Sequence, residues 1–414
     1  MRLPASVRAL RCVRCGAEST DFWQWTCPEG CIPDVRMDVQ LHPGAAEEMG
    51  RSLTGRPHDH WRYREVLPLP DDPTLPPLQV GWTPVHPTPR LAPWLGVREA
   101  WVKDDGRNPS ASLKDRASSV GVVLALAAGS ERIVCASTGN AASATACMAA
   151  SVGLPATIFV PERAPAPKIA QLRVFGAEVL RVQSDYDTAW DLCAEVAKNR
   201  PWFNRNCALN PYLVEGKKTV GLELAEQLGS KMPEWVVASV GDGCSIAGLV
   251  RGLEEACVAG LIDHVPKVLG VQAQGAAPLV AAARQGVAPS MSNAQTIADS
   301  LCVGVPRNPD KALQAVARTQ GAWVAVSDAA ILEALPATAS LTGIFGEPAA
   351  VTAAAGVRVA VEEGIIRADE GVAIISSGNG LKDPATALKS VTGPVDVAAD
   401  PESVVAALAQ LSTP

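Results

Sequence analysis

The chain has 414 residues, of which 48% are hydrophobic and 19% charged, with a formal net charge of −7 at pH 7. This length allows two or three domains with cores of their own. The acidic balance gives no reason to expect nucleic acid as a partner. No apolar run approaches the roughly 20 residues of a membrane-spanning helix, and the first residues lack the apolar segment of a secretory signal. We therefore expect a cytoplasmic protein with no membrane partner, whose cysteines are thiols or metal ligands.

Four of the eleven cysteines fall within the first 31 residues, as the pairs Cys12, Cys15 and Cys27, Cys31. Two close thiolate pairs on either side of a short loop are typical of a tetrahedral zinc ribbon. We expect residues 1–40 to form a zinc-ribbon-like head with a structural role, because four thiolates leave no position open for a substrate. Four unconnected thiols in a flexible arm are the alternative. A nucleic-acid-binding ribbon is disfavoured, because acidic residues offset the arginines of the head.

After the head, residues 41–95 are predicted to form an extended arm or linker, since the part from Leu67 to Pro93 is rich in proline and holds few periodic signals. From about residue 98, short β-branched runs alternate with amphipathic stretches. In chain order the predictions are strand 99–103, helix 113–127, strand 132–136, helix 141–151, strand 156–160, helix 167–175, strand 178–182, helix 185–198, strand 235–240, helix 245–259, strand 267–273, strand 323–326, helix 347–363, strand 372–376 and helix 401–411.

This alternation predicts an α/β protein with two three-layer domains, each a parallel sheet covered by helices on both faces. A large domain is expected from residues 96–130 and 230–414, and a small α/β domain from residues 131–229. Ligands of such sheets bind at the carboxyl ends of the strands. The polar loops at these ends are therefore the places to search for chemistry.

Four polar loops lie at such positions. One precedes Lys114, and the others are Ser137–Asn140, Gly241–Ser245 and Ser376–Gly380. The loop Gly241–Ser245 opens a helix, so its backbone amides are expected to form an anion site. Its glycines carry no side chain and therefore let a phosphate approach the backbone closely. It departs from the dinucleotide-binding motif, because no glycine stands three positions after Gly243. The carboxylate of Asp242 would repel a phosphate, so we expect it to turn away while its amide binds.

Several segments, in this order, resemble the fold-type II family of pyridoxal phosphate enzymes and, within it, the threonine synthases. The resemblance runs from about Gly81 to Pro384, and the cysteine head resembles one carried by some threonine synthases. The family implies a homodimer and a small amino-acid substrate. The segments that carry the resemblance are Trp101–Arg116, Asn210–Thr219, Thr296–Asp299, Gly346–Ala349 and Gly378–Pro384.

The resemblance also implies roles for single residues. Lys114 is expected to carry pyridoxal 5'-phosphate as an imine and to move the α-proton of the substrate. Asn140 would bind the 3-oxygen of the cofactor, and Ser377 its pyridine nitrogen. The cofactor phosphate is assigned to Gly241, Asp242, Gly243, Cys244 and Ser245, and the substrate carboxylate to Ser137, Thr138 and Asn140, for which helix capping is the competing account.

Ser377 bears on the type of reaction. A neutral hydroxyl beside the pyridine nitrogen leaves the ring a weaker electron sink than an aspartate would. This favours elimination and replacement at Cβ or Cγ over transamination. A threonine synthase would act on O-phosphohomoserine, expelling phosphate from Cγ and adding water at Cβ, and so needs a second anion site.

Two departures from the family pattern concern that second site. Leu213 stands where threonine synthases commonly carry an arginine, and Asp242 lies in a loop where they often have asparagine. Both changes should weaken binding of a phosphorylated side chain. Lys217, Lys218 or Arg173 could compensate, or the phosphate is held elsewhere and nothing has changed.

A threonine synthase is the favoured prediction, and three alternatives stay open. A serine or threonine dehydratase would release a keto acid and ammonia. A cysteate-synthase-like enzyme would exchange a β-substituent for an external nucleophile. A non-catalytic regulator could keep the fold, although the presence of Lys114 argues against it.

Overall fold

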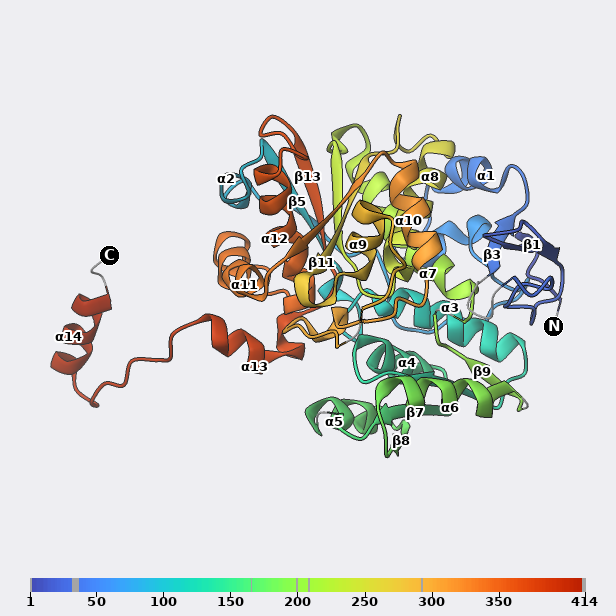
Figure 1. The fold of residues 1–414 in the computed structure, drawn as a ribbon, viewed down its shortest axis with the longest axis horizontal. Coiled ribbons are helices and arrows are strands. Elements are labelled where there is room, and N and C mark those ends of the chain that lie inside the picture. Colours follow the sequence, from blue (N-terminus) through green and yellow to red (C-terminus); the bar gives the residue numbers. More distant parts are fainter. Residues whose placement is uncertain are drawn as a thin grey trace.

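The computed structural model describes residues 2–31, 37–164, 166–198, 200–207, 209–291 and 293–411. It contains three sheets (Figure 1), and its α/β architecture confirms the predicted fold class. Every strand and helix predicted beyond residue 98 is present, with ends displaced by at most one residue. The head forms an antiparallel sheet in the order β2-β1-β3, with β1 at Val7–Cys12, β2 at Glu18–Ser19 and β3 at Met37–Leu41.

A six-stranded sheet forms the centre of the larger body, in the order β12-β11-β10-β13-β5-β4. Five strands are parallel, and β4 adds an antiparallel edge from within the segment expected to be an arm. The sheet is buried on both faces, so its sequence reads as continuous apolar runs. Its strands are β4 (Val85–Pro87), β5 (Glu99–Asp104), β10 (Trp235–Ser239), β11 (Lys267–Ala273), β12 (Ala322–Val326) and β13 (Gly371–Ser376).

Alternate residues of β10 supply two different cores. Val236 and Ala238 pack with α7, α8 and α10 on one face, whereas Trp235 and Val237 pack with α2, α11 and α12 on the other. The two groups of helices lie on opposite sides of the sheet in Figure 1. The helices are α1 (Ala45–Ser52), α2 (Leu91–Leu95), α7 (Tyr212–Leu228), α8 (Cys244–Val258), α9 (Pro278–Gln285), α10 (Pro309–Arg318), α11 (Asp328–Thr342), α12 (Pro348–Glu362) and the short α13 (Pro384–Ala387).

A four-stranded parallel sheet, in the order β8-β7-β6-β9, forms the smaller body. Helices α3, α4 and α5 pack on one face and α6 on the other. The predicted domain boundaries stay a prediction. Helix α3 covers the small sheet, and α7 lies against α8 of the larger body. The elements are β6 (Arg132–Ala136), β7 (Ala156–Pro161), β8 (Glu178–Val182), β9 (Trp202–Asn204), α3 (Lys114–Ala127), α4 (Asn140–Ser151), α5 (Ala166–Val174) and α6 (Tyr186–Lys198).

The head docks onto the start of α7. The ring of Phe22 stacks on Tyr212 with 4.8 Å between ring centroids, and the Tyr212 hydroxyl donates to the Phe22 carbonyl oxygen at 3.1 Å. On the other side of the head, Lys311 Nζ donates to the Met37 carbonyl oxygen at 2.7 Å. The head is therefore part of the packed body rather than a separate appendage.

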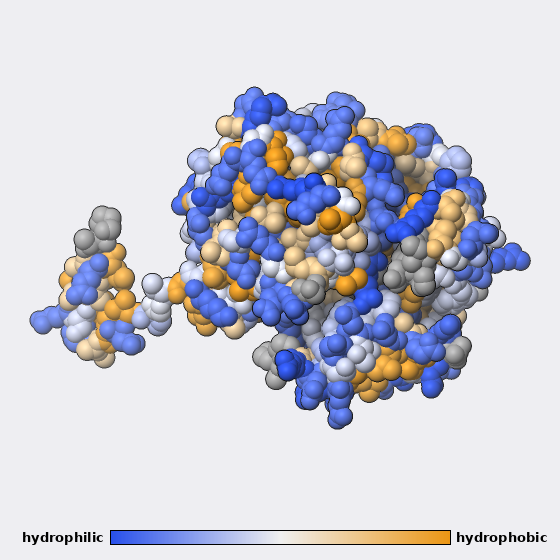
Figure 2. Space-filling view, in the orientation of Figure 1, coloured by the Kyte–Doolittle hydropathy of each residue, from blue (hydrophilic) through white to orange (hydrophobic). Residues whose placement is uncertain are grey.

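The last helix, α14 (Pro401–Leu411), lies away from the body at the end of an extended segment (Figure 1). Its surface includes exposed apolar side chains, among them Val405 and Leu411 (Figure 2). Among the described residues, no helix is both long and apolar enough to cross a membrane.

Candidate active site

The predicted site residues line one cavity of about 440 Å³. The cavity lies where the carboxyl ends of strands from both sheets meet, as expected for parallel α/β sheets. Loops that are far apart in the sequence therefore share its wall. The predicted residues on that wall are Lys114, Ser137, Thr138, Asn140, Gly241, Asp242, Gly243, Cys244, Ser245 and Ser377.

Lys114 is the first residue of α3, and its position is fixed by the loop after β13. The Leu113 N–H donates to the Ser377 carbonyl oxygen at 2.9 Å, and Ser112 forms a β-bridge with Gly378. Burial and, after it, the charge of Lys217 lower the pKa of Lys114 to about 8. Lys114 therefore carries an amine that loses its proton near neutral pH, as a covalent catalyst requires.

A buried charge network holds the start of α3 in place. Arg116 donates through Nε and Nη2 to Asp105, at 2.7 and 2.8 Å. Through Nη1 and Nη2 it donates to Glu223, at 2.6 and 2.7 Å. Lys103 Nζ donates to the same carboxylate at 2.8 Å, and all four side chains are fully buried. This network ties the segment that carries Lys114 to β5 and α7.

The loop Gly241–Ser245 has the features of a phosphate site. None of its five backbone N–H groups has a hydrogen-bond acceptor within the part of the chain that the structure describes. Gly243 has φ +89°, and a Cβ atom there would lie 2.8 Å from the Asn308 carbonyl oxygen, so only glycine fits. Asp242 Oδ1 accepts from the Arg307 N–H at 3.2 Å. Its carboxylate is thus engaged outside the loop, while the free amides stand at the N-terminus of α8.

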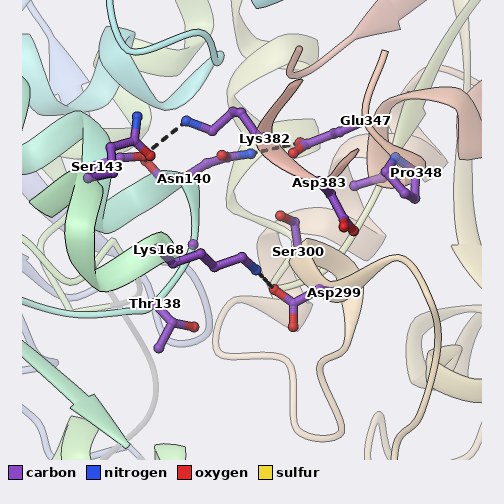
Figure 3. Close-up of a pocket in the computed structure, with 13 residues that line it drawn as sticks. Thr138, Asn140, Ser143, Lys168, Asp299, Ser300, Glu347, Pro348, Lys382 and Asp383 are labelled. Atoms are coloured by element: carbon purple, nitrogen blue, oxygen red, sulfur yellow. Dashed lines mark hydrogen bonds and ion pairs between the residues drawn. The ribbon is translucent and has the colours of Figure 1, made fainter. Parts of the chain in front are cut away.

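Asn140 and Glu347 point toward each other across the cavity edge (Figure 3), and Asn140 Nδ2 donates to Glu347 Oε1 at 2.7 Å. An amide nitrogen carries two N–H groups, so the second stays available for a ligand. Burial raises the pKa of Glu347, and the charge of Lys114 opposes that rise. In the same view Lys168 forms an ion pair with Asp299 at the small adjoining pocket.

The loop before α4 contains further free amides. The N-cap of α4 is Gly139, and no side chain caps it. Ser137 Oγ instead accepts from the Gly139 N–H at 3.2 Å. The N–H groups of Thr138, Asn140 and Ala141 have no acceptor among the described residues. Amides at a helix N-terminus favour an anion such as a carboxylate.

Residues 77–378 match the family of pyridoxal-phosphate dependent enzymes. The chain belongs to this family. It is 36% identical to the threonine synthase of Methanocaldococcus jannaschii over 395 residues, which covers 94% of this chain and 96% of that protein. It is 34% identical to the threonine synthase of Mycobacterium bovis, covering 83% of this chain and 93% of that protein. A fungal L-serine ammonia-lyase from Rhizomucor miehei shares the fold, with a TM-score of 0.66 and 22% identity over 74% of this chain and 96% of that one.

Membership confirms the predicted class, a pyridoxal phosphate-dependent lyase that eliminates or replaces groups at Cβ or Cγ of an amino acid. The cavity fits the cofactor on independent grounds. It joins a partly buried lysine of lowered pKa to a loop of five free amides. The Ser377 hydroxyl on its wall has no hydrogen-bond partner among the described residues. The roles of the individual residues stay predictions.

Arg205 also lines the cavity of this pyridoxal-phosphate dependent enzyme, and sequence reasoning missed it. Its Nε donates to Ser118 Oγ at 3.1 Å and its Nη1 to Cys207 Sγ at 3.1 Å. A hydrogen bond with Cys244, together with the charge of Arg205, lowers the pKa of Cys207. Arg205 directly follows β9, at the carboxyl end of a strand. The three residues of β9 were too few to be predicted as a strand, so the position of Arg205 gave no signal.

In the head, the four predicted metal ligands converge. The sulfur atoms of Cys12, Cys15, Cys27 and Cys31 all lie within 4.8 Å of one another. Cys12 ends β1, and turns with positive φ at Gly16 and Gly30 bring the remaining thiols back toward it. Four thiols at this spacing match the donor set of a structural zinc site.

Proposed function

We propose that the protein is a threonine synthase, which converts O-phosphohomoserine and water into threonine and phosphate. The observation that carries this proposal is the placement of Lys114 between two separate groups of free amides, in a chain that resembles threonine synthases over nearly its whole length. One group of amides suits the phosphate of the cofactor. The other suits the carboxylate of an amino acid.

Pyridoxal phosphate, when bound, withdraws electrons from the amino acid and so makes its Cα and Cβ protons acidic. The amides of residues 241–245 would hold its phosphate, Ser377 its pyridine nitrogen and the second N–H of Asn140 its 3-oxygen. Lys114 would hold it covalently and then, once released, accept the α-proton at Nζ. A pKa of about 8 allows Lys114 both to take a proton and to return one near neutral pH.

The substrate is oriented by groups of its own. The amides of Thr138, Asn140 and Ala141 would bind its carboxylate, which points the side chain into the remainder of the cavity. Glu347 fixes Asn140 and thereby the start of α4. Phosphate leaves Cγ, which gains a proton in its place, while Cβ loses a proton and gains the hydroxyl of water, so O-phosphohomoserine and water become threonine and phosphate.

The proposal includes a structural zinc ion on the four thiolates of the head. Zinc would join the strand β1 to the loop that contains Phe22, which contacts Tyr212. We also propose a homodimer, which the exposed apolar side chains of α14 support. Location in the cytoplasm stays a prediction.

A β-eliminating enzyme, such as a serine or threonine dehydratase, is the second candidate. Leu213 favours it, because this side chain is fully buried and cannot bind a phosphate. The deciding experiment supplies O-phosphohomoserine, O-phosphoserine, serine and threonine separately and measures threonine, phosphate, keto acid and ammonia. Threonine and phosphate from O-phosphohomoserine would support the proposal. Keto acid and ammonia from serine or threonine, with no threonine formed, would overturn it.

A further inference from the structure

We propose that Arg205 and Lys217 form a second anion site in the same cavity, which binds the phosphate group of the amino-acid substrate. This inference rests on the proposed function and names the residues that would give it specificity for a phosphorylated side chain. Both residues line the cavity. Arg205 follows β9 of the smaller body, and Lys217 lies on α7.

Both cations are buried, and neither is paired with a carboxylate that the structure describes. Arg205 is 1% exposed and Lys217 is 2% exposed, yet within the described ranges neither forms an ion pair with a carboxylate. Arg205 Nη2 is buried with no hydrogen-bond partner. Buried charges in proteins are normally paired. Cys207, which accepts from Nη1 and whose pKa is lowered, is the one acidic group that the described residues place against the guanidinium, and it leaves Nη2 without a partner.

The carboxylates that share the cavity wall are engaged elsewhere. Asp242 accepts from the Arg307 N–H, Glu347 accepts from Asn140, and Asp299 pairs with Lys168. No carboxylate among the described residues of the wall is thus left to neutralise Arg205 and Lys217. The Cys207 thiol can carry one negative charge beside these two cations, and a bound anion would supply the other.

The other cations considered from the sequence are excluded by their positions. Lys218 is fully buried in ion pairs with Glu215 and Glu255, at 2.7 and 2.9 Å. Arg173 is exposed on α5 and does not line the cavity. Arg163 also lines the cavity, but its side chain is exposed. Apart from Lys114, which the cofactor would occupy, Lys217 and Arg205 are the buried cations of the cavity wall that have no carboxylate partner in the described part of the chain.

The packing around Arg205 explains how a leucine can occupy position 213. A Cβ atom on Gly121 would lie 3.1 Å from Leu213 Cδ2 and 4.0 Å from Arg205 Cγ. Leu213 and the aliphatic stem of Arg205 therefore pack over the same glycine. The leucine thus fills space beside Gly121, and Arg205 lines the cavity from a position eight residues earlier.

The cofactor phosphate does not need these cations. Five free amides at the N-terminus of α8 already form a complete site for it. A guanidinium with a free Nη2 and a nearby ammonium instead suit a second phosphate, because charge-assisted hydrogen bonds to phosphate are strong in a buried site. Cys207 accepts from Arg205 Nη1 and leaves Nη2 available.

The test measures binding of inorganic phosphate to the cofactor-loaded enzyme by titration calorimetry at constant ionic strength. Variants Arg205→Met, Arg205→Lys and Lys217→Met are compared with Arg173→Met, which removes an exposed charge outside the cavity. Loss of a charge-assisted hydrogen bond should weaken phosphate binding by about tenfold or more in the two cavity methionine variants. Arg205→Lys should lose less, and Arg173→Met should match the wild type.

Cofactor content, measured as pyridoxal phosphate released from each variant, separates the two phosphate sites. We expect Arg205→Met to retain a full complement of cofactor, and its KM for the phosphorylated substrate to rise more than its kcat falls. Phosphate affinity within twofold of wild type in both Arg205 variants would overturn the inference. So would loss of cofactor in parallel with phosphate affinity, since the pair would then serve the cofactor.

The experiments distinguish failure of this inference from failure of the proposed function. Keto acid from serine alone, with phosphate binding still dependent on Arg205, would refute threonine synthesis and leave the anion site in place. Threonine formation with an unchanged KM in Arg205→Met would refute the anion site and leave the proposed function in place. Circular dichroism of each variant shows whether it is folded before it is compared.

Discussion

Glu223 lies at the centre of the buried network that positions Lys114, and its replacement by glutamine is the most informative perturbation. The carboxylate accepts three hydrogen bonds, from Arg116 Nη1, Arg116 Nη2 and Lys103 Nζ. Glutamine has the same shape, so the substitution leaves no cavity. It removes the negative charge and places an amide N–H₂ group beside the positively charged hydrogen-bond donors of Arg116 and Lys103.

The expected destabilisation is large. Asp105 would be the one carboxylate left to balance Lys103 and Arg116, and all of these side chains are fully buried. Removing one partner of a buried ion pair destabilises a protein by about 3–5 kcal/mol. We expect Glu223→Gln to lower the free energy of unfolding by that amount. A matched control is Glu363→Gln, because Glu363 and its partner Arg284 are 39% and 43% exposed and such a pair contributes about 0–1 kcal/mol.

The assay is urea denaturation followed by circular dichroism at equal protein concentrations. The pH dependence gives a second readout. Burial raises the pKa of Glu223, but the charges of Arg116 and Lys103 outweigh burial and hold it below its usual range. A depressed pKa contributes stability that is fully present above the unfolded value, about 4.3, and is lost as the pH falls through the folded value. The gap between wild type and variant should be constant above about pH 5 and narrow below about pH 4.

Two results would refute this reasoning. If Glu223→Gln and Glu363→Gln had the same small effect, the network would not be stabilised by its charge. If the gap between wild type and Glu223→Gln stayed constant down to strongly acidic pH, the pKa of Glu223 would not be depressed, and shape rather than charge would explain the loss.

Three further predictions concern the cofactor and the head. Lys114→Ala should purify without the visible absorbance band of the wild type and without a borohydride-reducible link, and an unchanged spectrum would refute the assignment of Lys114. Lys217→Met should shift the pH midpoint for cofactor incorporation upward, because the charge of Lys217 contributes to lowering the pKa of Lys114 to about 8. Stopped-flow absorbance after cofactor-free protein is mixed with pyridoxal phosphate measures this midpoint. An unchanged midpoint would contradict the prediction. Metal analysis should find one zinc ion per chain in the wild type and none in Cys12→Ser, and fresh wild-type protein without zinc would exclude a structural metal.

The parallel α/β framework could be predicted because its strands and helices carry strong local signals. β-Branched runs such as those of β10 and β11 separate clearly from the helices around them. Helix α7 was missed for a physical reason. Its residues from Tyr212 to Ala225 are all buried, so the helix has no polar face and its sequence shows no amphipathic period.

The loops of the candidate site could also be predicted, because each follows a recognisable strand or opens a recognisable helix. The groups that connect those loops could not. The role of Arg116 in the buried network could not be predicted. Nothing local in the sequence indicates that its guanidinium binds both Asp105 and Glu223, which lie 11 and 107 residues away. Arg205 was missed because it follows a strand of three residues. Both depend on contacts that exist only after the chain has folded.

The first turn of α7 connects the head to the chemistry. Tyr212, which begins this helix, contacts Phe22 of the head through its ring and its hydroxyl. Lys217 lies five residues further along the same helix and faces the cavity, while Glu223, about three turns beyond the head contact, anchors Arg116. Because a buried helix moves as a rigid element, a shift of the head at Tyr212 would move a cation of the cavity and the anchor of the Lys114 segment together. A zinc ion on the four thiols of the head would hold the head rigid and thereby stabilise the site itself, which is the structural role that we propose for this cluster.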